Sequence, residues 1–241
     1  MIKAKQAIIL VAGEGRRLRP FTQYKPKCFA EVAGQPILKH ALYALSGHGC
    51  EEITVVTGHL SQMVREIITD RFDGMAVRYV ENPDYATSNS MLSLALGLEG
   101  VNRPTWVLEG DVIFDPAILA LSAKAPISWF ADSSTHHLDG AYIECGPDNL
   151  AVSLDIVRDM SALRAGQLKS MGILHLSQAG VKNVRQWLAR GVRDGRQNDY
   201  YDLILRDHLG SNLVQVVDVA GHRWFEIDSN EDLNCASALF S

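Results

Sequence analysis

A short apolar run near the start of the chain leads into a glycine turn and a cluster of cationic side chains. The apolar run spans residues 7–12, and the residues of interest that follow it are Gly13, Glu14, Gly15, Arg16, Arg17, Arg19 and Lys27. Glycine lets a backbone turn tightly and present its N–H groups to a phosphate, while arginine and lysine neutralise phosphate charge. This order predicts a buried strand that ends at a site for a nucleoside triphosphate.

The two glycines alone are compatible with any tight turn that follows a strand. The segment lacks the Gly-x-x-x-x-Gly-Lys-Ser/Thr sequence of a P-loop and the third glycine of a dinucleotide-binding motif. The arginines and the Pro26-Lys27 pair therefore carry the prediction of a triphosphate site. P-loop ATPases, dehydrogenases and flavodoxin-like domains are disfavoured.

Acidic residues follow a second apolar run. Residues 105–108 are expected to form a strand, and a Glu-Gly-Asp triplet comes directly after it. Because ligands of an open α/β sheet bind at the carboxyl ends of its strands, Asp111 should lie near the cationic turn. Mg²⁺ typically binds one or two carboxylates together with phosphate oxygens and water, and Asp111 and Asp228 would supply that pair. A plain turn at Asp111 and a helix cap at Asp228 are the alternatives, and Glu109 and Glu226 are further candidates.

Charge alone indicates the chemistry that such a site could perform. A phosphate monoester or phosphonate is already anionic at neutral pH, so no base has to remove a proton before it attacks a second phosphate. The obstacle is repulsion between the two anions, which Mg²⁺ and cationic side chains would reduce. The predicted catalytic residues are Arg17, Lys27, Asp111 and Asp228. The predicted reaction is displacement at the α-phosphorus with release of pyrophosphate.

Three segments carry a resemblance to known proteins. They are Ala12-Gly13-Glu14-Gly15-Arg16-Arg17-Leu18-Arg19-Pro20 with Thr22, Pro26-Lys27, Val32, Gly34-Gln35-Pro36 and Leu38, then residues 82–94, then residues 225–229. The first resembles the opening motif of the nucleotidyltransferase family of sugar-phosphate pyrophosphorylases and cytidylyltransferases. The other two resemble bacterial CTP:phosphocholine cytidylyltransferases and their relatives that act on aminoalkyl phosphates or phosphonates. The resemblance is sparse only between about residues 120 and 195.

The resemblance implies a nucleotide-diphospho-sugar transferase-like domain, Mg²⁺ on Asp111 and Asp228, and CTP as the nucleotide. The predicted nucleotide-binding residues are Ala12, Gly13, Glu14, Gly15, Arg16, Arg17, Lys27, Ser88, Asn89, Glu109 and Asp111. The turn at Ser88 and Asn89 is equally compatible with the N-cap of a helix.

The partner of the nucleotide is expected to be a small phosphorylated acceptor. Candidate acceptor-binding residues are Tyr200, Asp202, Trp224 and Glu226. Aromatic faces attract a quaternary ammonium through cation–π interactions, and carboxylates add charge. Tyr200, Asp202 and Glu226 match positions of the phosphocholine branch, but aromatic packing and capping acids are the alternative. Phosphocholine, a primary aminoalkyl phosphate or phosphonate and a sugar phosphate all stay open.

Segments typical of strands and helices alternate along the chain, which indicates an α/β fold. Strands are expected near residues 6–12, 53–57, 77–80, 105–108, 127–131, 140–145, 151–157, 170–176 and 213–219. Helices are expected from Pro36 as the first helical residue, after a cap at Ser61, over residues 88–98, 180–193 and 199–209, and from Ser229. We expect a Rossmann-like mixed, mostly parallel sheet flanked by helices. One domain, residues 1–241, would comprise a nucleotide-binding half (about 1–125) and an acceptor-binding half (about 126–241).

Composition limits the other possibilities. The 241 residues carry a formal net charge of −5, which disfavours nucleic acid as a partner, and no apolar run approaches a membrane span. Four scattered cysteines suit a reducing cytoplasm better than a disulfide framework. A homo-oligomer is compatible with the sequence. Two other functions stay open, namely a sugar-1-phosphate nucleotidylyltransferase that uses UTP, dTTP or CTP, and a non-catalytic regulatory module that binds nucleotide.

Overall fold

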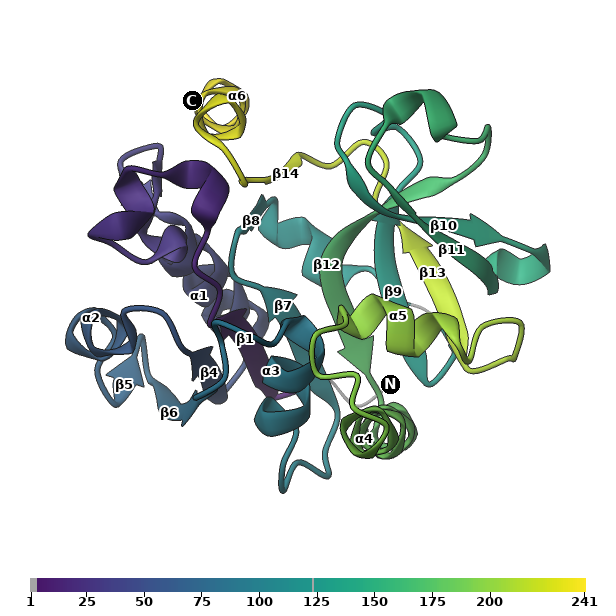
Figure 1. Ribbon diagram of the computed structural model, residues 1–241, viewed down its shortest axis with the longest axis horizontal. Coiled ribbons are helices and arrows are strands. Elements are labelled where there is room, and N and C mark those ends of the chain that lie inside the picture. The colour runs from purple at the N-terminus through teal and green to yellow at the C-terminus, as the bar shows by residue number, and fades with distance from the viewer. Residues whose placement is uncertain (1–3, 123) are drawn as a thin grey trace.

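Strands that alternate with helices build a mixed sheet at the centre of the molecule (Figure 1). The computed structural model describes residues 4–122 and 124–241. The ten strands of the main sheet have the order β11-β10-β12-β7-β1-β4-β6-β5, with β9 paired to β12 and β13. The strands are β1 (Gln6–Val11), β2 (Glu31–Val32), β3 (Gln35–Pro36), β4 (Glu52–Thr57), β5 (Arg71–Phe72), β6 (Met75–Glu81), β7 (Thr105–Glu109), β8 (Val112–Phe114), β9 (Ile127–Asp132), β10 (Gly140–Cys145), β11 (Ala151–Val157), β12 (Leu168–Leu176), β13 (Val214–Asp218) and β14 (Trp224–Glu226).

The strands at the centre of the sheet are parallel, and the helices that connect such strands cover them on both faces. All six residues of β1 are buried, and β1 pairs in parallel with β4 on one side and β7 on the other. A strand buried on both faces has no reason to alternate apolar and polar residues, which explains the continuous apolar run in the sequence. The expected Rossmann-like α/β fold with a mixed sheet and flanking helices is confirmed.

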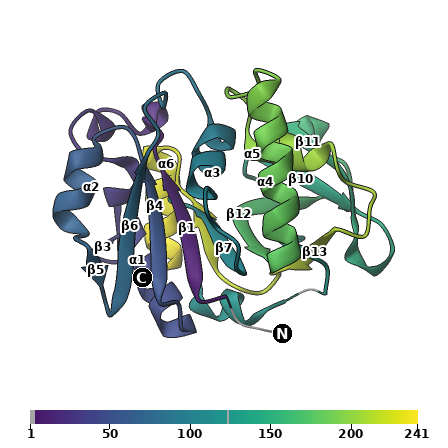
Figure 2. The ribbon, with the colours of Figure 1, turned by 90° about the horizontal axis from the view of Figure 1, so that it is seen from below.

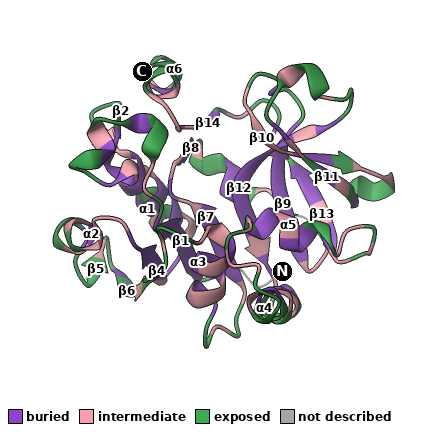
Figure 3. Ribbon diagram, viewed as in Figure 1, coloured by how far each residue is buried: buried purple, intermediate pink, exposed green. Residues whose placement is uncertain are grey.

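Helices cover the two faces of this sheet. They are α1 (Ile37–His48), α2 (Ser61–Ile67), α3 (Ser90–Gly97), α4 (Gln178–Arg193), α5 (Tyr201–Arg206) and α6 (Asn230–Leu239). On one face Ile9 of β1 shares a core with residues of α1 and α2, and on the other Ile8 shares a core with residues of α3, α4 and α5. The helices α3, α4 and α5 lie side by side (Figure 2), and the strands between the helical layers are buried (Figure 3).

Antiparallel strands extend the sheet toward the second half of the chain. Strand β12 runs antiparallel to β7 and also pairs with β9 and β10. Its register with β9 is interrupted between Ser170 and Ile173, where Gly172 has a φ of +68°. A side chain at Gly172 would meet Glu109, so this irregularity brings the two strands close at the position where β7 ends.

A separate two-stranded ribbon connects the end of the chain to the end of β7. Strand β14 pairs antiparallel with β8, so that Glu226 lies opposite Val112. The backbone N–H of Ile227 donates to the carbonyl of Asp111 at 3.0 Å. This register places Asp228 beside Asp111. The following helix, α6, is capped by Ser229 and packs over the N-terminal loop, as its position in Figure 1 shows.

Most expected helices and strands are present, but one expected cap is wrong. Leu60, with a left-handed φ of +53°, occupies the N-cap position of α2, and α2 begins at Ser61. The expected capping hydrogen bond to the Ser61 side chain is therefore not formed among the described residues. Asn89 caps α3, and its side chain accepts a hydrogen bond from the N–H of Ser90. The helix expected over residues 199–209 is the shorter α5. Among the described residues, no helix is both long and apolar enough to cross a membrane.

Gly110 directly follows β7 and packs closely against the end of β1. A Cβ atom there would lie 2.3 Å from Val11 Cγ1 and 2.9 Å from the carbonyl oxygen of Leu10. We predict that Gly110→Ala lowers the free energy of unfolding by about 1–3 kcal/mol, because overpacking forces β1 and β7 apart. Urea denaturation measures this value. The control Gly47→Ala, in α1, where the added Cβ would meet no described residue outside the neighbouring turns of the helix, should be neutral or stabilising. Equal effects would contradict the packing argument.

Candidate active site

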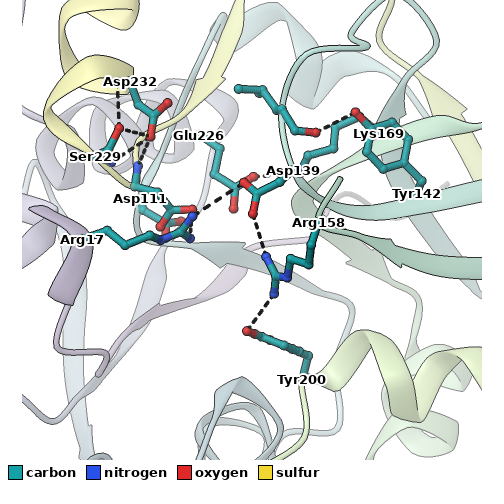
Figure 4. Close-up of polar contacts among 12 residues, drawn as sticks. Arg17, Asp111, Asp139, Tyr142, Arg158, Lys169, Tyr200, Glu226, Ser229 and Asp232 are labelled. Atoms are coloured by element: carbon teal, nitrogen blue, oxygen red, sulfur yellow. Dashed lines mark hydrogen bonds and ion pairs between the residues drawn. The ribbon is translucent and has the colours of Figure 1, made fainter. Parts of the chain in front are cut away.

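A cavity of about 240 Å³ opens where β1 and β7 end, beside the first residues of β12. Its lining comes from both halves of the chain. The residues from the first half that line it are Leu10, Ala12, Gly13, Arg17, Asn82, Tyr85, Ser88, Asn89, Ser90, Ser93, Glu109 and Asp111. Those from the second half are Asp139, Gly140, Ala141, Ile156, Arg158, Lys169, Ser170, Gly172, Tyr200, Asp202, Glu226 and Asp228. The polar side chains from the two halves face one another (Figure 4).

The glycine turn brings Lys27 close to the end of β1. Gly15 has a φ of +60°, and a Cβ atom there would lie 3.0 Å from both Lys27 Cβ and Thr22 Cγ2. The hydroxyl of Thr22 donates to the carbonyl of Gly15 at 2.8 Å, which holds the turn. Only glycine accepts this backbone conformation and this close approach without strain. The turn therefore positions Lys27 rather than leaving it on the surface.

Lys27 joins the two predicted metal ligands. Its Nζ lies 2.6 Å from Asp111 Oδ2 and forms a second short ion pair with Asp228 Oδ1. All three side chains are largely buried. Burial by itself would lower the pKa of Lys27, but Asp111 and Asp228 outweigh it and hold that pKa above its ordinary value. Burial would raise the pKa of Asp228, but Lys27 and Arg17 outweigh it and hold that pKa below its ordinary value.

The other arginines of the opening motif differ in their positions. Arg17 reaches the cavity and pairs with Asp228. Arg16 points away from the cavity lining and pairs with Glu14 at 2.5 Å. Of the predicted nucleotide-binding residues, Glu14, Gly15, Arg16 and Lys27 do not line the cavity, whereas the remaining seven do. Gly15 and Lys27 shape it from behind.

The polar turn before α3 forms another part of the wall. Asn82 donates to the hydroxyls of Ser88 and Ser93, both at 3.0 Å. The N–H of Asn89 donates to the carbonyl of Gln197 at 2.9 Å, which ties this turn to the segment that precedes α5. Asn89 is therefore the N-cap of α3, which was the alternative expected for this turn. Both Ser88 and Asn89 also line the cavity.

One end of the cavity, which adjoins Asp111, is strongly acidic. Glu109, Asp202 and Glu226 surround one lysine, Lys169, whose Nζ lies 2.7 Å from Glu226 Oε2 and whose side chain is only 3% exposed. Burial raises the pKa of Asp202 to about 6 and that of Glu109 well above its ordinary value. Burial also raises the pKa of Glu226, although Lys169 opposes it. The carboxyl groups outnumber the nearby ammonium, so this end favours a cationic group.

Of the two predicted acceptor-binding aromatic residues, Tyr200 lines the cavity and Trp224 does not. Trp224 is buried and outside the cavity lining, and its indole donates to Asp132 Oδ2 at 2.8 Å. A buried indole N–H needs an acceptor, and this bond fixes the ring behind the wall. The guanidinium of Arg158 lies 5.8 Å from the ring centre of Tyr200 and donates to its hydroxyl at 3.1 Å. Tyr200 does line the cavity, but one cation already lies over its ring.

Sequence reasoning missed Lys169, Arg158 and Asp139. Lys169 had a signal, since it directly precedes the strand that was expected over residues 170–176. Arg158 and Asp139 lie in the segment where the resemblance is sparse, and no spacing rule connects them to residues 17 or 228. Only the pairing of β10 with β11 brings them together.

The carboxylates next to Lys27 suit a hard metal ion. Asp111 Oδ1 is buried and has no hydrogen-bond partner among the described residues. The other oxygen of this carboxylate, Oδ2, pairs with Lys27, which also pairs with Asp228. The described residues contain no group of three or more His, Cys, Asp or Glu side chains arranged to hold a metal by themselves. Two carboxylates fit Mg²⁺, which takes its remaining ligands from phosphates and water.

A glycine turn, a carboxylate pair and a polar cavity at the ends of parallel strands are typical of α/β proteins that bind their ligands at the carboxyl edge of the sheet. Residues 7–138 match the model of the MobA-like NTP transferase domain. The chain belongs to this family. The resemblance to nucleotidyltransferases that the opening motif predicted is therefore confirmed.

Individual relatives are similar over nearly the whole chain. The chain is 35% identical to CMP-5'-(3-aminopropyl)phosphonate synthase of Streptomyces rubellomurinus over 98% of its own length, but it spans only 39% of that protein. It is 26% identical to choline-phosphate cytidylyltransferase of Streptococcus pneumoniae over 94% of each chain. The solved CTP:phosphocholine cytidylyltransferase of Streptococcus pneumoniae has a similar fold, with a TM-score of 0.81, 21% identity and coverage of 98% and 99%. These names bear out the expected likeness to the cytidylyltransferase branch.

Lys27 should be needed for folding stability, because its removal leaves two neighbouring carboxylates uncompensated. We predict that Lys27→Met lowers the free energy of unfolding by about 3 kcal/mol in the presence of EDTA. Urea denaturation at neutral pH measures this difference. The control Lys5→Met removes an exposed ion pair with Glu51 and should cost less than about 1 kcal/mol. Similar losses in the two variants would contradict the account of the cluster.

The pKa of Asp202 gives stability a specific pH dependence. Because folding raises this pKa from 3.8 to about 6, the folded protein holds the proton more tightly. The contribution of Asp202 to stability is therefore fully present below pH 3.8 and is lost as the pH rises through about 6. We predict that Asp202→Asn matches the wild type near pH 4 and exceeds it by up to about 3 kcal/mol above pH 7. Urea titrations across this range test it, and a difference independent of pH would contradict it.

Proposed function

We propose that the protein transfers CMP from CTP to a small phosphorylated acceptor that carries an amino group, with release of pyrophosphate. The observation that carries this proposal is the meeting of Lys27, Asp111 and Asp228 beside the glycine turn. Such a cluster can hold the polyphosphate of a nucleotide next to a second anion. The resemblance to relatives named for CMP transfer supports CTP as the nucleotide.

The proposed reaction needs no general base. The acceptor oxygen is anionic at neutral pH and would attack the α-phosphorus in line with departing pyrophosphate. Arg17, at the cavity wall, would neutralise charge on the triphosphate, while Lys27 keeps the two carboxylates directed at one point. Asp111 and Asp228 would hold Mg²⁺, which when bound supplies Lewis-acid stabilisation of phosphate charge.

The acidic end of the cavity supports an amino group on the acceptor. Glu109, Asp202 and Glu226 can accept the hydrogen bonds that a primary ammonium donates. A trimethylammonium group donates none and depends on open aromatic faces. Trp224 lies behind the wall and the ring of Tyr200 already faces Arg158, so the site favours a primary amine over choline.

A pyrophosphate-release screen tests the proposal. CTP, UTP, dTTP, ATP and GTP are each combined with 2-aminoethylphosphonate, phosphoethanolamine, phosphocholine and hexose 1-phosphates in the presence of Mg²⁺. We predict release with CTP and a primary aminoalkyl acceptor, and loss of activity in EDTA that returns when Mg²⁺ is added in excess.

Each other outcome of the screen has a meaning. Release only with a hexose 1-phosphate would replace the proposal by a sugar-nucleotide activity. Nucleotide binding without release from any pair would support a regulatory module instead. The cytoplasmic location stays a prediction from the sequence.

A further inference from the structure

A chain of polar contacts crosses the mouth of the cavity (Figure 4). One carboxylate, that of Asp139, contacts two guanidinium groups from opposite halves of the chain. Asp139 Oδ2 accepts from Arg158 Nη1 at 2.9 Å, and Asp139 Oδ1 lies 3.6 Å from Arg17 Nη1. Arg158 also donates to the hydroxyl of Tyr200. All four side chains line the cavity.

These contacts can exchange partners easily. The side chain of Arg158 is 51% exposed and that of Asp139 is 37% exposed. Exposed ion pairs contribute little to stability, so their loss on ligand binding costs little. Arginine presents a planar set of donors that matches the oxygens of a carboxylate or a phosphate equally well. Asp139 therefore occupies a place between two arginines that suits a ligand anion.

The other cationic side chains of the cavity wall already form ion pairs with carboxylates next to the proposed substrate groups. Lys169 is buried in its pair with Glu226, and Arg17 pairs with Asp228 next to the proposed triphosphate site. Arg158 is the remaining cation of the described lining, and it lies on the acceptor half of the chain. A zwitterionic acceptor whose ammonium enters the acidic end needs a cation for its anionic group on this side.

We propose that Arg158 binds the phospho or phosphono group of the acceptor and that this group displaces Asp139 from Arg158. The inference rests on the proposed function. Arg158 is then an acceptor-binding residue, whereas Arg17 and Lys27 act at the nucleotide. Tyr200, whose hydroxyl and ring contact the guanidinium, positions Arg158.

Steady-state kinetics of Arg158→Gln test this role with the acceptor that the wild type uses. We expect its KM for the acceptor to rise about 10- to 100-fold while its KM for CTP stays within about twofold, since only acceptor binding loses a charged hydrogen bond. The control is Arg164→Gln. Arg164 is similarly exposed and pairs with Asp155 at 2.5 Å outside the cavity lining, so both KM values should stay unchanged.

Asp139→Asn tests the displacement. We expect an unchanged or lower KM for the acceptor, because the competing carboxylate is gone. An increase like that of Arg158→Gln would show that Asp139 positions the arginine and would overturn the displacement. An unchanged acceptor KM in Arg158→Gln, with an active wild type, would overturn the role of Arg158 alone. A wild type that releases pyrophosphate from no acceptor would instead overturn the proposed function.

Discussion

One lysine shared between two aspartates holds the site together. Lys27 contacts Asp111 and Asp228, and the three residues come from three distant parts of the chain. Two carboxylates at one buried point repel each other unless a cation compensates them. The ion pairs therefore fix the glycine turn, the end of β7 and the segment after β14 relative to one another. The same convergence makes the site suitable for Mg²⁺ and polyphosphate.

The fold supplies this convergence through two separate devices. Parallel pairing of β1 with β7 brings the glycine turn and Asp111 to the same edge of the sheet. The antiparallel ribbon of β8 and β14 then fixes Asp228 beside Asp111, since Glu226 pairs with Val112. The irregular strand β12 completes the cavity by carrying Lys169 to the acidic end. Glu109 and Asp111 lie at the end of one strand and Glu226 and Asp228 at the end of another, so the acidic end and the carboxylate pair next to Lys27 are built on the same two segments.

The sequence was most informative where local chemistry and periodicity agree. The apolar run before Gly13 predicted β1, and the types and order of Lys27, Asp111 and Asp228 were enough to predict a common site, which the structure brings together. The residues proposed to bind the acceptor were harder to predict from the sequence, because the pairing of distant strands decides which of them reach the cavity. Trp224 and Glu226 are two residues apart, yet a hydrogen bond to Asp132 holds the indole behind the wall while the carboxylate reaches the cavity. No pattern in the sequence connected Arg158 to Asp139.

Metal binding tests the central claim most directly. Mn²⁺ bound by the wild type in the presence of a non-hydrolysable CTP analogue can be measured by electron paramagnetic resonance, together with Asp111→Asn, Asp228→Asn and, as a control, Asp194→Asn at the exposed end of α4. If the two carboxylates form one site, each of the first two substitutions weakens Mn²⁺ binding by at least about tenfold and the control does not. Equal Mn²⁺ affinity in all four proteins would contradict the account.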